Sequence, residues 1–186
     1  MPLVLVWVNQ FVNTLRAGDV AGVVTAVSTA IGLWFLLRRR SAVAVDYSLT
    51  AWSAAIAGTA IPMFLHPGGT ALVPGAVSAL VAVAGVLVTT VGFLSLGQSF
   101  GVVPSNRGIV STGIYGWVRH PLYAGYFVTH VGFCLANPTP FNLLIWITGD
   151  TIQLVRIRYE ERLLARDDSY RDYQTRVRWR LLPGVF

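Results

Sequence analysis

Residues 71–96 read ALVPGAVSALVAVAGVLVTTVGFLSL, a stretch without a single charged side chain. A helix needs about 20 predominantly apolar residues to cross the hydrocarbon core of a bilayer, so this stretch is long enough to span with tilt. Two further stretches meet the same requirement, at residues 20–37 and 47–65. These three segments indicate an integral membrane protein rather than a soluble domain.

The composition of the whole chain supports this interpretation. Of its 186 residues, 54% are hydrophobic and only 12% are charged, about half of the roughly 25% charged share of soluble domains. The net charge of +6, in so apolar a chain, favours contact with membrane lipids over binding to nucleic acid. Because Cys134 is the single cysteine, neither a disulfide framework nor a cysteine-cluster zinc site is expected. We therefore expect no nucleic-acid partner and no metal.

Two shorter apolar runs, residues 122–136 and 141–155, flank the turn Asn137-Pro138-Thr139-Pro140 and predict a helical hairpin. The hairpin could span fully or be partly re-entrant. Full spanning is favoured because the second run continues in helical style to residue 164. The predicted fold class is all-α, a polytopic membrane protein of about five transmembrane helices. Residues 2–15 could form an interfacial helix or extend the first span.

The arginines predict the orientation of the five spans. Three follow the first span, two lie between the third and fourth, and eight follow the fifth. Five spans place all thirteen on one side, and only Arg16 lies opposite. Cytoplasmic loops are enriched in basic residues, so this side, with the C-terminus, is predicted to be cytoplasmic.

Small residues recur along one helical face of the segment 71–96. They are Ser78, Ala82, Gly85, Thr89 and Gly92. Small stripes let membrane helices approach closely, so helix packing is the favoured interpretation and a ligand groove the alternative.

The stretch GIYGWVRHPLYAG at residues 113–125 leads into the fourth predicted span. Pro121 suits the first turn of a helix, where its missing N–H costs nothing. Arg119 and His120 then lie at a helix N-terminus, which favours anions. Gly125 would let another backbone or a ligand approach closely. An anion cradle and an interfacial Arg-His anchor are equally compatible with these residues.

A second polar cluster lies on the helix that leaves the fifth span. Gln153, Arg156 and Glu160 lie within about 60° of one another on a helical wheel, and Glu161 follows. Arg156 and Glu160 could simply pair at i,i+4. Alternatively, the two acids could hold an ammonium group or ribose hydroxyls next to the basic segment.

Two further features carry polar chemistry. Asp150 lies at membrane depth, where a carboxylate is costly and marks a candidate functional site, with His130 as a possible partner. A structural hydrogen bond between them is as plausible as a catalytic role. The C-terminal tail interleaves arginines and aromatics, which suits a segment that closes over a site or an anchor on anionic lipid. Its residues are Tyr170, Tyr173, Arg176, Arg178, Trp179, Arg180 and Pro183.

Together these motifs resemble the isoprenylcysteine carboxyl methyltransferases, and the related phospholipid N-methyltransferases share much of the pattern. The resemblance covers about residues 92–186, and Ile114 departs from it where the family usually has proline. The segment between the paired glutamates and Tyr170 is also short and lacks the usual glycine. The matching residues are the run 113–125, Glu160-Glu161, Leu163-Leu164, Tyr170, Tyr173, Val177 and Arg180-Leu181-Leu182-Pro183.

The resemblance implies an integral membrane enzyme that takes S-adenosylmethionine from the cytoplasm and a lipophilic or prenylated substrate from the bilayer. Residues 1–97 would form three N-terminal spans, and residues 98–186 the catalytic region. Arg156 and Arg180 would hold an anionic substrate head as catalytic residues, with Glu160 as the base if the acceptor is an amine. The implied cofactor contacts are Tyr115, Arg119, His120, Pro121, Tyr123, Gly125, Glu160 and Glu161.

Three functions are compatible with these residues. The favoured one is O-methylation of the carboxylate of an isoprenylcysteine-like acceptor. This carboxylate is ionised at pH 7, so the reaction needs it to be oriented but needs no general base. The first alternative is N-methylation of a phospholipid or another small lipid. The second is a non-catalytic membrane interaction or transport protein, in which Asp150 and His130 would mark a polar path.

Overall fold

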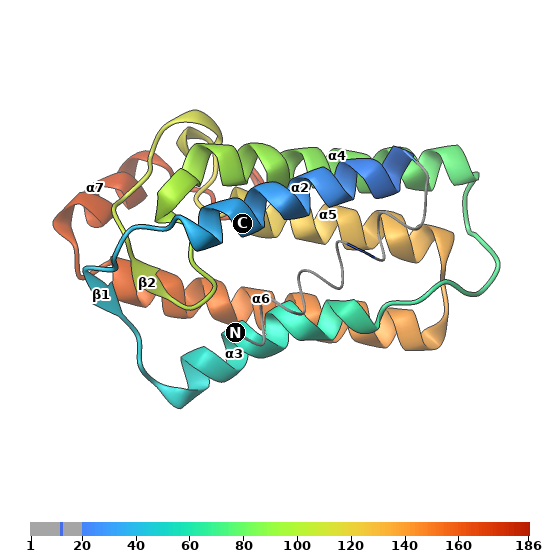
Figure 1. Ribbon diagram of the computed structural model, residues 1–186, viewed down its shortest axis with the longest axis horizontal. Helices are drawn as coiled ribbons and strands as arrows, with labels where there is room; N and C mark the ends of the chain where they lie inside the picture. Colours follow the sequence, from blue (N-terminus) through green and yellow to red (C-terminus); the bar gives the residue numbers. More distant parts are fainter. Residues whose placement is uncertain (1–11, 13–19) are drawn as a thin grey trace.

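The computed structural model describes residue 12 and residues 20–186 (Figure 1). The expectation for residues 2–15 therefore falls almost wholly outside the described residues. The described part is mostly helical, as predicted, and short 3-10 turns extend α3 and α4. Its helices are α2 (Val20–Leu37), α3 (Leu49–Ala60), α4 (Gly75–Leu96), α5 (Pro121–Ala136), α6 (Pro140–Leu164) and α7 (Asp168–Arg176).

A small sheet corrects the all-α prediction. Strand β1 (Ala44–Val45) pairs antiparallel with β2 (Ser105–Asn106), with Ala44 opposite Asn106. Two-residue strands carry no alternating pattern that a sequence could reveal. The Asn106 side chain also donates to the Asp167 carboxylate at 2.9 Å, just before α7. The sheet and this bond hold the loop after α4 against the C-terminal region.

The helices form two layers (Figure 1). In one layer α4 packs between α2 and α5, and in the other α3 packs against α6. At one end, the fully buried Asn142 joins the layers, because its Nδ2 donates to the carbonyl oxygens of His66 at 2.9 Å and Asn137 at 2.8 Å. Helix α7 lies at the opposite end (Figure 1).

Glycines bring α4 and α5 into backbone contact. A Cβ added at Gly125 would lie 2.7 Å from the Thr89 amide nitrogen, and one at Gly132 would lie 2.5 Å from the Ala82 amide nitrogen. A Cβ at Gly85 would lie 2.7 Å from the Gly125 carbonyl oxygen. The small-residue stripe therefore packs helices at Gly85 and Thr89, as the favoured interpretation predicts, while Ser78 and Ala82 at its other end also line a cavity.

The structure does not confirm the predicted number of five transmembrane helices. Within the described residues, Gly75–Ser99 is the one helix that is both long and apolar enough to cross a membrane by length and composition. Val23–Leu37 and Leu49–Phe64 are apolar but shorter. Helix α5 has 16 residues, and α6 has 25 but carries Asp150 within its apolar segment and further charged residues beyond residue 155.

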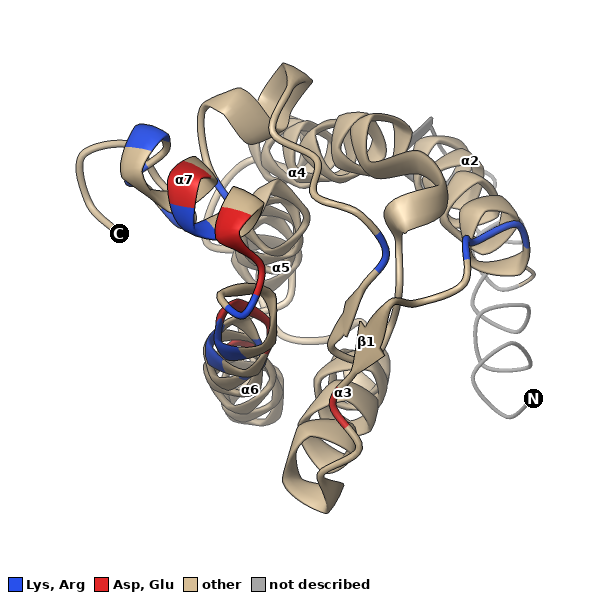
Figure 2. Cartoon of the chain, turned by 90° about the vertical axis from the view of Figure 1, so that its left-hand side faces the viewer, with Lys and Arg blue, Asp and Glu red and all other residues tan. Residues whose placement is uncertain are grey.

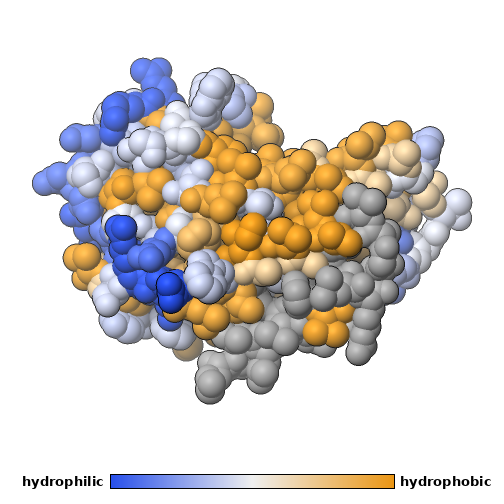
Figure 3. All heavy atoms as spheres, turned by 45° about the horizontal axis from the view of Figure 1, so that its top comes forward, coloured by the Kyte–Doolittle hydropathy of each residue, from blue (hydrophilic) through white to orange (hydrophobic). Residues whose placement is uncertain are grey.

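Charge separates the two ends of the molecule. The arginines gather where α2 ends, where the sheet lies and where α6 meets α7 (Figure 2). Hydrophilic atoms cover this end on the face shown in Figure 3, and apolar atoms cover most of the rest of that face. The predicted clustering of the arginines on one side is thus present in the fold.

Candidate active site

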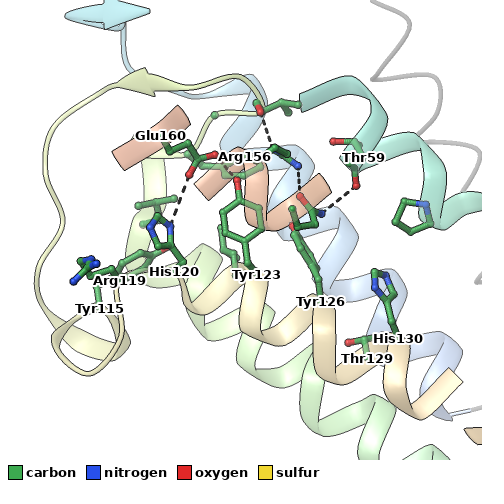
Figure 4. Close-up of a pocket in the computed structure, with 18 of the residues that line it drawn as sticks. Thr59, Tyr115, Arg119, His120, Tyr123, Tyr126, Thr129, His130, Arg156 and Glu160 are labelled. Atoms are coloured by element: carbon green, nitrogen blue, oxygen red, sulfur yellow. Dashed lines mark hydrogen bonds and ion pairs between the residues drawn. The ribbon is translucent and has the colours of Figure 1, made fainter. Parts of the chain in front are cut away.

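A cavity of about 940 Å³ lies between the two layers of helices. Its charged end is lined by Arg119, His120, Arg156 and Glu160. Figure 4 shows His120 directed toward Glu160 with Arg156 nearby, whereas the Arg119 side chain points away from them. From there the cavity continues between the layers to Ala136 near the α5–α6 turn. One hollow therefore connects a polar site with a long and largely apolar space.

The segment before α5 is fixed by the C-terminal tail. His120 is the N-cap of α5, and Pro121 occupies the first turn, as predicted. The amides of Arg119 and His120 donate to the carbonyl oxygens of Trp179 at 2.9 Å and Arg180 at 2.8 Å. These two amides bind the tail and not a ligand, so the predicted anion cradle depends on side chains.

His120 joins the two glutamates that lie forty residues further along the chain. Its Nε2 lies 3.2 Å from Glu161 Oε1, and its Nδ1 lies 3.9 Å from Glu160 Oε2. The Tyr123 hydroxyl donates to the Glu160 carboxylate. The two halves of the sequence pattern therefore meet at the charged end of the cavity.

Glu161 is the buried centre of this cluster. Its carboxylate accepts from Arg119 Nε and Arg180 Nε, each at 2.9 Å. Burial alone would raise the pKa of Glu161, but hydrogen bonds from His120, Arg119 and Arg180 lower it to about 2. Glu161 does not line the cavity, whereas Glu160 does. This geometry favours a positioning role for Glu161 over direct contact with a cofactor.

Arg156 is a buried cation without a carboxylate partner. Its Nη1 donates to Gln153 Oε1 and its Nη2 to the Val102 carbonyl oxygen, both at 2.8 Å, while its Nε has no partner within the described part of the chain. Among the described residues no carboxylate lies within 4.0 Å of it, so the i,i+4 pair with Glu160 is not formed. Burying an uncompensated charge is costly, which favours an anionic ligand here.

The predicted site residues divide into two groups. Arg180 pairs with Glu161 and lies over the Phe186 ring, away from the cavity, while Gly125 packs against α4. The residues that line the cavity are Tyr115, Arg119, His120, Tyr123, Arg156 and Glu160. Those that do not are Pro121, Gly125, Glu161 and Arg180.

Several lining residues were not assigned to the cofactor site from the sequence, among them Tyr126, Tyr170 and Arg107. Tyr126 lies one turn beyond Tyr123 on α5, so helical spacing could have indicated it. The Tyr170 hydroxyl and Arg107 Nε are buried and have no hydrogen-bond partner in the part of the chain that the structure describes, and both residues line the cavity. Burial raises the pKa of Tyr170, so its hydroxyl stays a donor. Arg107 follows strand β2, whose pairing no sequence signal revealed.

His130 and Asp150 form the pair that their depth suggested. His130 Nδ1 lies 2.9 Å from Asp150 Oδ1, and Trp146 Nε1 donates to Asp150 Oδ2 at 2.6 Å. His130 also lines the cavity. In the part of the chain that the structure describes, no cluster of three or more His, Cys, Asp or Glu side chains could hold a metal ion.

Residues 76–166 match the isoprenylcysteine carboxyl methyltransferase (ICMT) family. The protein-S-isoprenylcysteine O-methyltransferase of Saccharomyces cerevisiae is 31% identical over 107 residues, which cover 53% of this chain and 44% of that protein. The protein of the same name from Schizosaccharomyces pombe is 37% identical over 93 residues, 44% of this chain and 38% of its own. The chain thus matches less than half of the length of either relative.

A solved structure of the eukaryotic intramembrane Ras methyltransferase ICMT aligns with 95% of this chain and 68% of its own. The TM-score is 0.56 and the sequence identity is 20%, a likeness that concerns the fold alone. The resemblance that the motifs indicated is thereby confirmed: this chain has an ICMT-like fold, and its residues 76–166 carry the sequence pattern of the isoprenylcysteine carboxyl methyltransferase family.

Proposed function

We propose that this chain is an integral membrane methyltransferase that uses S-adenosylmethionine to methylate the carboxylate of an isoprenylcysteine-like lipophilic acceptor. The observation that carries the proposal is the meeting of His120 and Glu160 at the charged end of a cavity that is largely apolar beyond it. The names of the relatives and the fold similarity support the same reaction.

The charged end of the cavity fits S-adenosylmethionine chemically. Glu160 offers a carboxylate to an ammonium group or to ribose hydroxyls, and the unpartnered Tyr170 hydroxyl and Arg107 Nε are donors without acceptors. Aromatic faces attract cations, and Tyr115 and Tyr123 line this end. When bound, the cofactor supplies an electrophilic methyl group on a positively charged sulfur.

Arg156 is the best candidate to hold the acceptor carboxylate. A guanidinium is always charged, and Gln153 and the Val102 carbonyl fix its orientation. An ionised carboxylate needs no general base, so Arg156 contributes by orienting and partly desolvating it. Because Arg180 is paired with Glu161, its proposed role is to hold that glutamate rather than the substrate.

The apolar part of the cavity would take the lipid tail of the acceptor. Its walls include Met63 from the 3-10 turn after α3, and Leu122 and Phe133 from α5. The proposed division of labour follows from this arrangement. Residues 98–186 supply the charged groups, whereas residues 1–97 supply part of the apolar wall.

The membrane is the proposed environment of the outer helix faces. Leu80 is 70% exposed, Leu144 62% and Ile147 60%, and lipid rather than water suits such surfaces. The arginine-rich end would face the cytoplasm, because basic residues favour that side. The cofactor would then enter at the charged end and the acceptor from the bilayer.

Ligand binding to detergent-purified protein tests the cofactor assignment. S-adenosylmethionine and S-adenosylhomocysteine should raise the melting temperature, whereas nicotinamide cofactors should not. His120→Ala and Glu160→Ala should abolish the shift, and the exposed Arg158→Ala, on the same helix as Glu160, should keep it. An unchanged shift in both site variants would overturn the assignment.

Product analysis then tests the reaction. With N-acetyl-S-farnesylcysteine and labelled S-adenosylmethionine, the product should be a methyl ester that alkali cleaves. An alkali-stable product from phospholipid would instead identify an N-methyltransferase. No transfer to either acceptor, with cofactor binding intact, would contradict the proposed substrate class.

A further inference from the structure

The pair formed by His130 and Asp150 is a second polar site, and its His130 lines the cavity away from the charged end. Residues 120, 123, 126 and 130 lie on one face of α5 and line the cavity in that order (Figure 4). His130 follows His120 by ten residues, and a helix rises 1.5 Å per residue, so the two lie about 15 Å apart along α5. Asp150 precedes Glu160 by ten residues on α6. The deep residue and the residue at the charged end are therefore the same number of residues apart on both chain segments.

The deep site has one group without a partner. The Asp150 carboxylate accepts from Trp146 Nε1 and faces His130 Nδ1, so Nδ1 carries a proton. The Nε2 atom of His130 then remains free to bond. Among the described residues, no hydrogen bond to Nε2 is formed.

Within the described structure, the hydroxyl groups near His130, unlike its Nε2 atom, already have hydrogen-bond partners. Thr59 donates to the Ala55 carbonyl at 2.8 Å, Thr129 to the Gly125 carbonyl at 2.9 Å and Ser78 to the Gly75 carbonyl at 3.0 Å. Their donors are therefore used within their own helices. His130 is instead fixed by a side chain from another helix, which holds its ring in a defined orientation in the cavity.

A hydrogen-bonded carboxylate and imidazole at membrane depth are costly to bury if they serve only to join two helices. We propose that His130, oriented by Asp150 and Trp146, binds a hydroxyl on the lipid tail of the acceptor, about 15 Å from the end that is methylated. A hydroxyl suits this position because it can donate to the unprotonated Nε2 or accept from the protonated one. This inference rests on the proposed function, and it narrows the acceptor class from lipophilic to hydroxylated lipophilic molecules.

Two probes of equal chain length test the inference. They are N-acetyl-S-geranylcysteine and its analogue with a hydroxyl at the far end of the geranyl chain. The unmodified protein should bind the hydroxylated probe about tenfold more tightly, as one added hydrogen bond allows. Both thermal-shift titration and the ratio of kcat/KM values should show this preference.

Substitutions at His130 separate recognition from helix joining. His130→Asn keeps an amide donor near the Nδ1 position, toward Asp150, but has no atom at Nε2, so the preference should fall to near one. His130→Gln places an amide near Nε2 while losing the contact with Asp150, so it should retain most of the preference. Thr59→Val, which removes a lining hydroxyl bonded within its own helix, should leave the preference unchanged.

The outcomes of these measurements distinguish the role of His130 from the proposed methylation reaction. Equal binding of both probes by the unmodified protein, or a preference that survives His130→Asn, would overturn the role of His130. A binding preference lost in His130→Asn, without methylation of either probe, would support the deep site and contradict the proposed reaction. Methylation of both probes at equal kcat/KM would support the reaction and contradict the deep site.

Discussion

At the scale of single residues, Arg156 is the proposed partner of the acceptor carboxylate. It is 6% exposed, and its Nε has no hydrogen-bond partner among the described residues. We expect Arg156→Met to raise the KM for a carboxylate acceptor about 10- to 100-fold, because hydrogen bonds to charged groups contribute about 1.5–3 kcal/mol. Steady-state kinetics with N-acetyl-S-farnesylcysteine would measure this change.

The exposed Arg158→Met provides the control for removing an arginine from the same helix. Its KM should stay close to that of the unmodified protein. If Arg156→Met instead abolished the thermal shift with S-adenosylmethionine and left the acceptor KM unchanged, Arg156 would belong to the cofactor site.

Glu161 should make stability depend on pH in the acidic range. Its pKa falls from 4.5 in its ordinary state to about 2 in the fold, so the folded state binds its proton more weakly than the unfolded state does. The stabilisation is complete above about pH 4.5 and is lost as the pH falls toward 2. Melting temperatures of the unmodified protein should therefore drop between pH 5 and pH 3.

Glu161→Gln should lower the melting temperature at pH 7 and flatten the decline between pH 5 and pH 3. The variant leaves Arg119 and Arg180 without their shared carboxylate, hence the loss at neutral pH. The exposed carboxylate in Asp172→Asn provides the comparison. A Glu161→Gln curve parallel to that of the unmodified protein would show that other groups cause the acid sensitivity.

At the scale of helices, the contact between α4 and α5 depends on glycine. In Gly125→Ala the new Cβ would lie 2.7 Å from the Thr89 amide nitrogen, so a backbone must move. Overpacking of this kind typically costs about 1–3 kcal/mol, and we expect the melting temperature to fall by several degrees. Gly75→Ala makes the same chemical change on α4, where a Cβ would meet nothing within 4 Å. Equal melting temperatures for the two variants would refute the close-packing argument.

The boundaries of the helices were easier to predict from the sequence than the contacts that each helix makes. Pro121 and the turn at residues 137–140 delimit α5 in the sequence, and the structure has the same boundaries. The antiparallel hairpin also explains why motifs forty residues apart meet. The roles of Glu160 and Glu161 were not separable, because adjacent residues on a helix point about 100° apart and only the packing decides which one faces the cavity. The loop at residues 101–110 also lines the cavity. Its place there could not be predicted, because the pair of two-residue strands that holds the loop is too short to produce an alternating sequence pattern.

At the scale of the whole molecule, the arginine-rich end predicts the orientation in the membrane. Two exposed positions at opposite ends, Thr70 and Ser169, can report it as single cysteines in a Cys134→Ala background. In intact cells, a membrane-impermeant maleimide should label Thr70→Cys directly and Ser169→Cys only after permeabilisation. The reverse pattern would place the charged end outside the cytoplasm.

The hydrogen bonds between the C-terminal tail and the amides of Arg119 and His120 determine where the chain can be truncated without loss of structure. The match to the family model ends at residue 166, but the carbonyl oxygens that accept from these two amides belong to residues 179 and 180. A fragment that ended at residue 166 would retain His120, Glu160 and Glu161. It would lose the two carbonyl oxygens that accept from the amides of residues 119 and 120, and the Arg180 guanidinium that donates to Glu161. We expect such a fragment to lose the main-chain bonds that fix the entry to α5 at the charged end of the cavity.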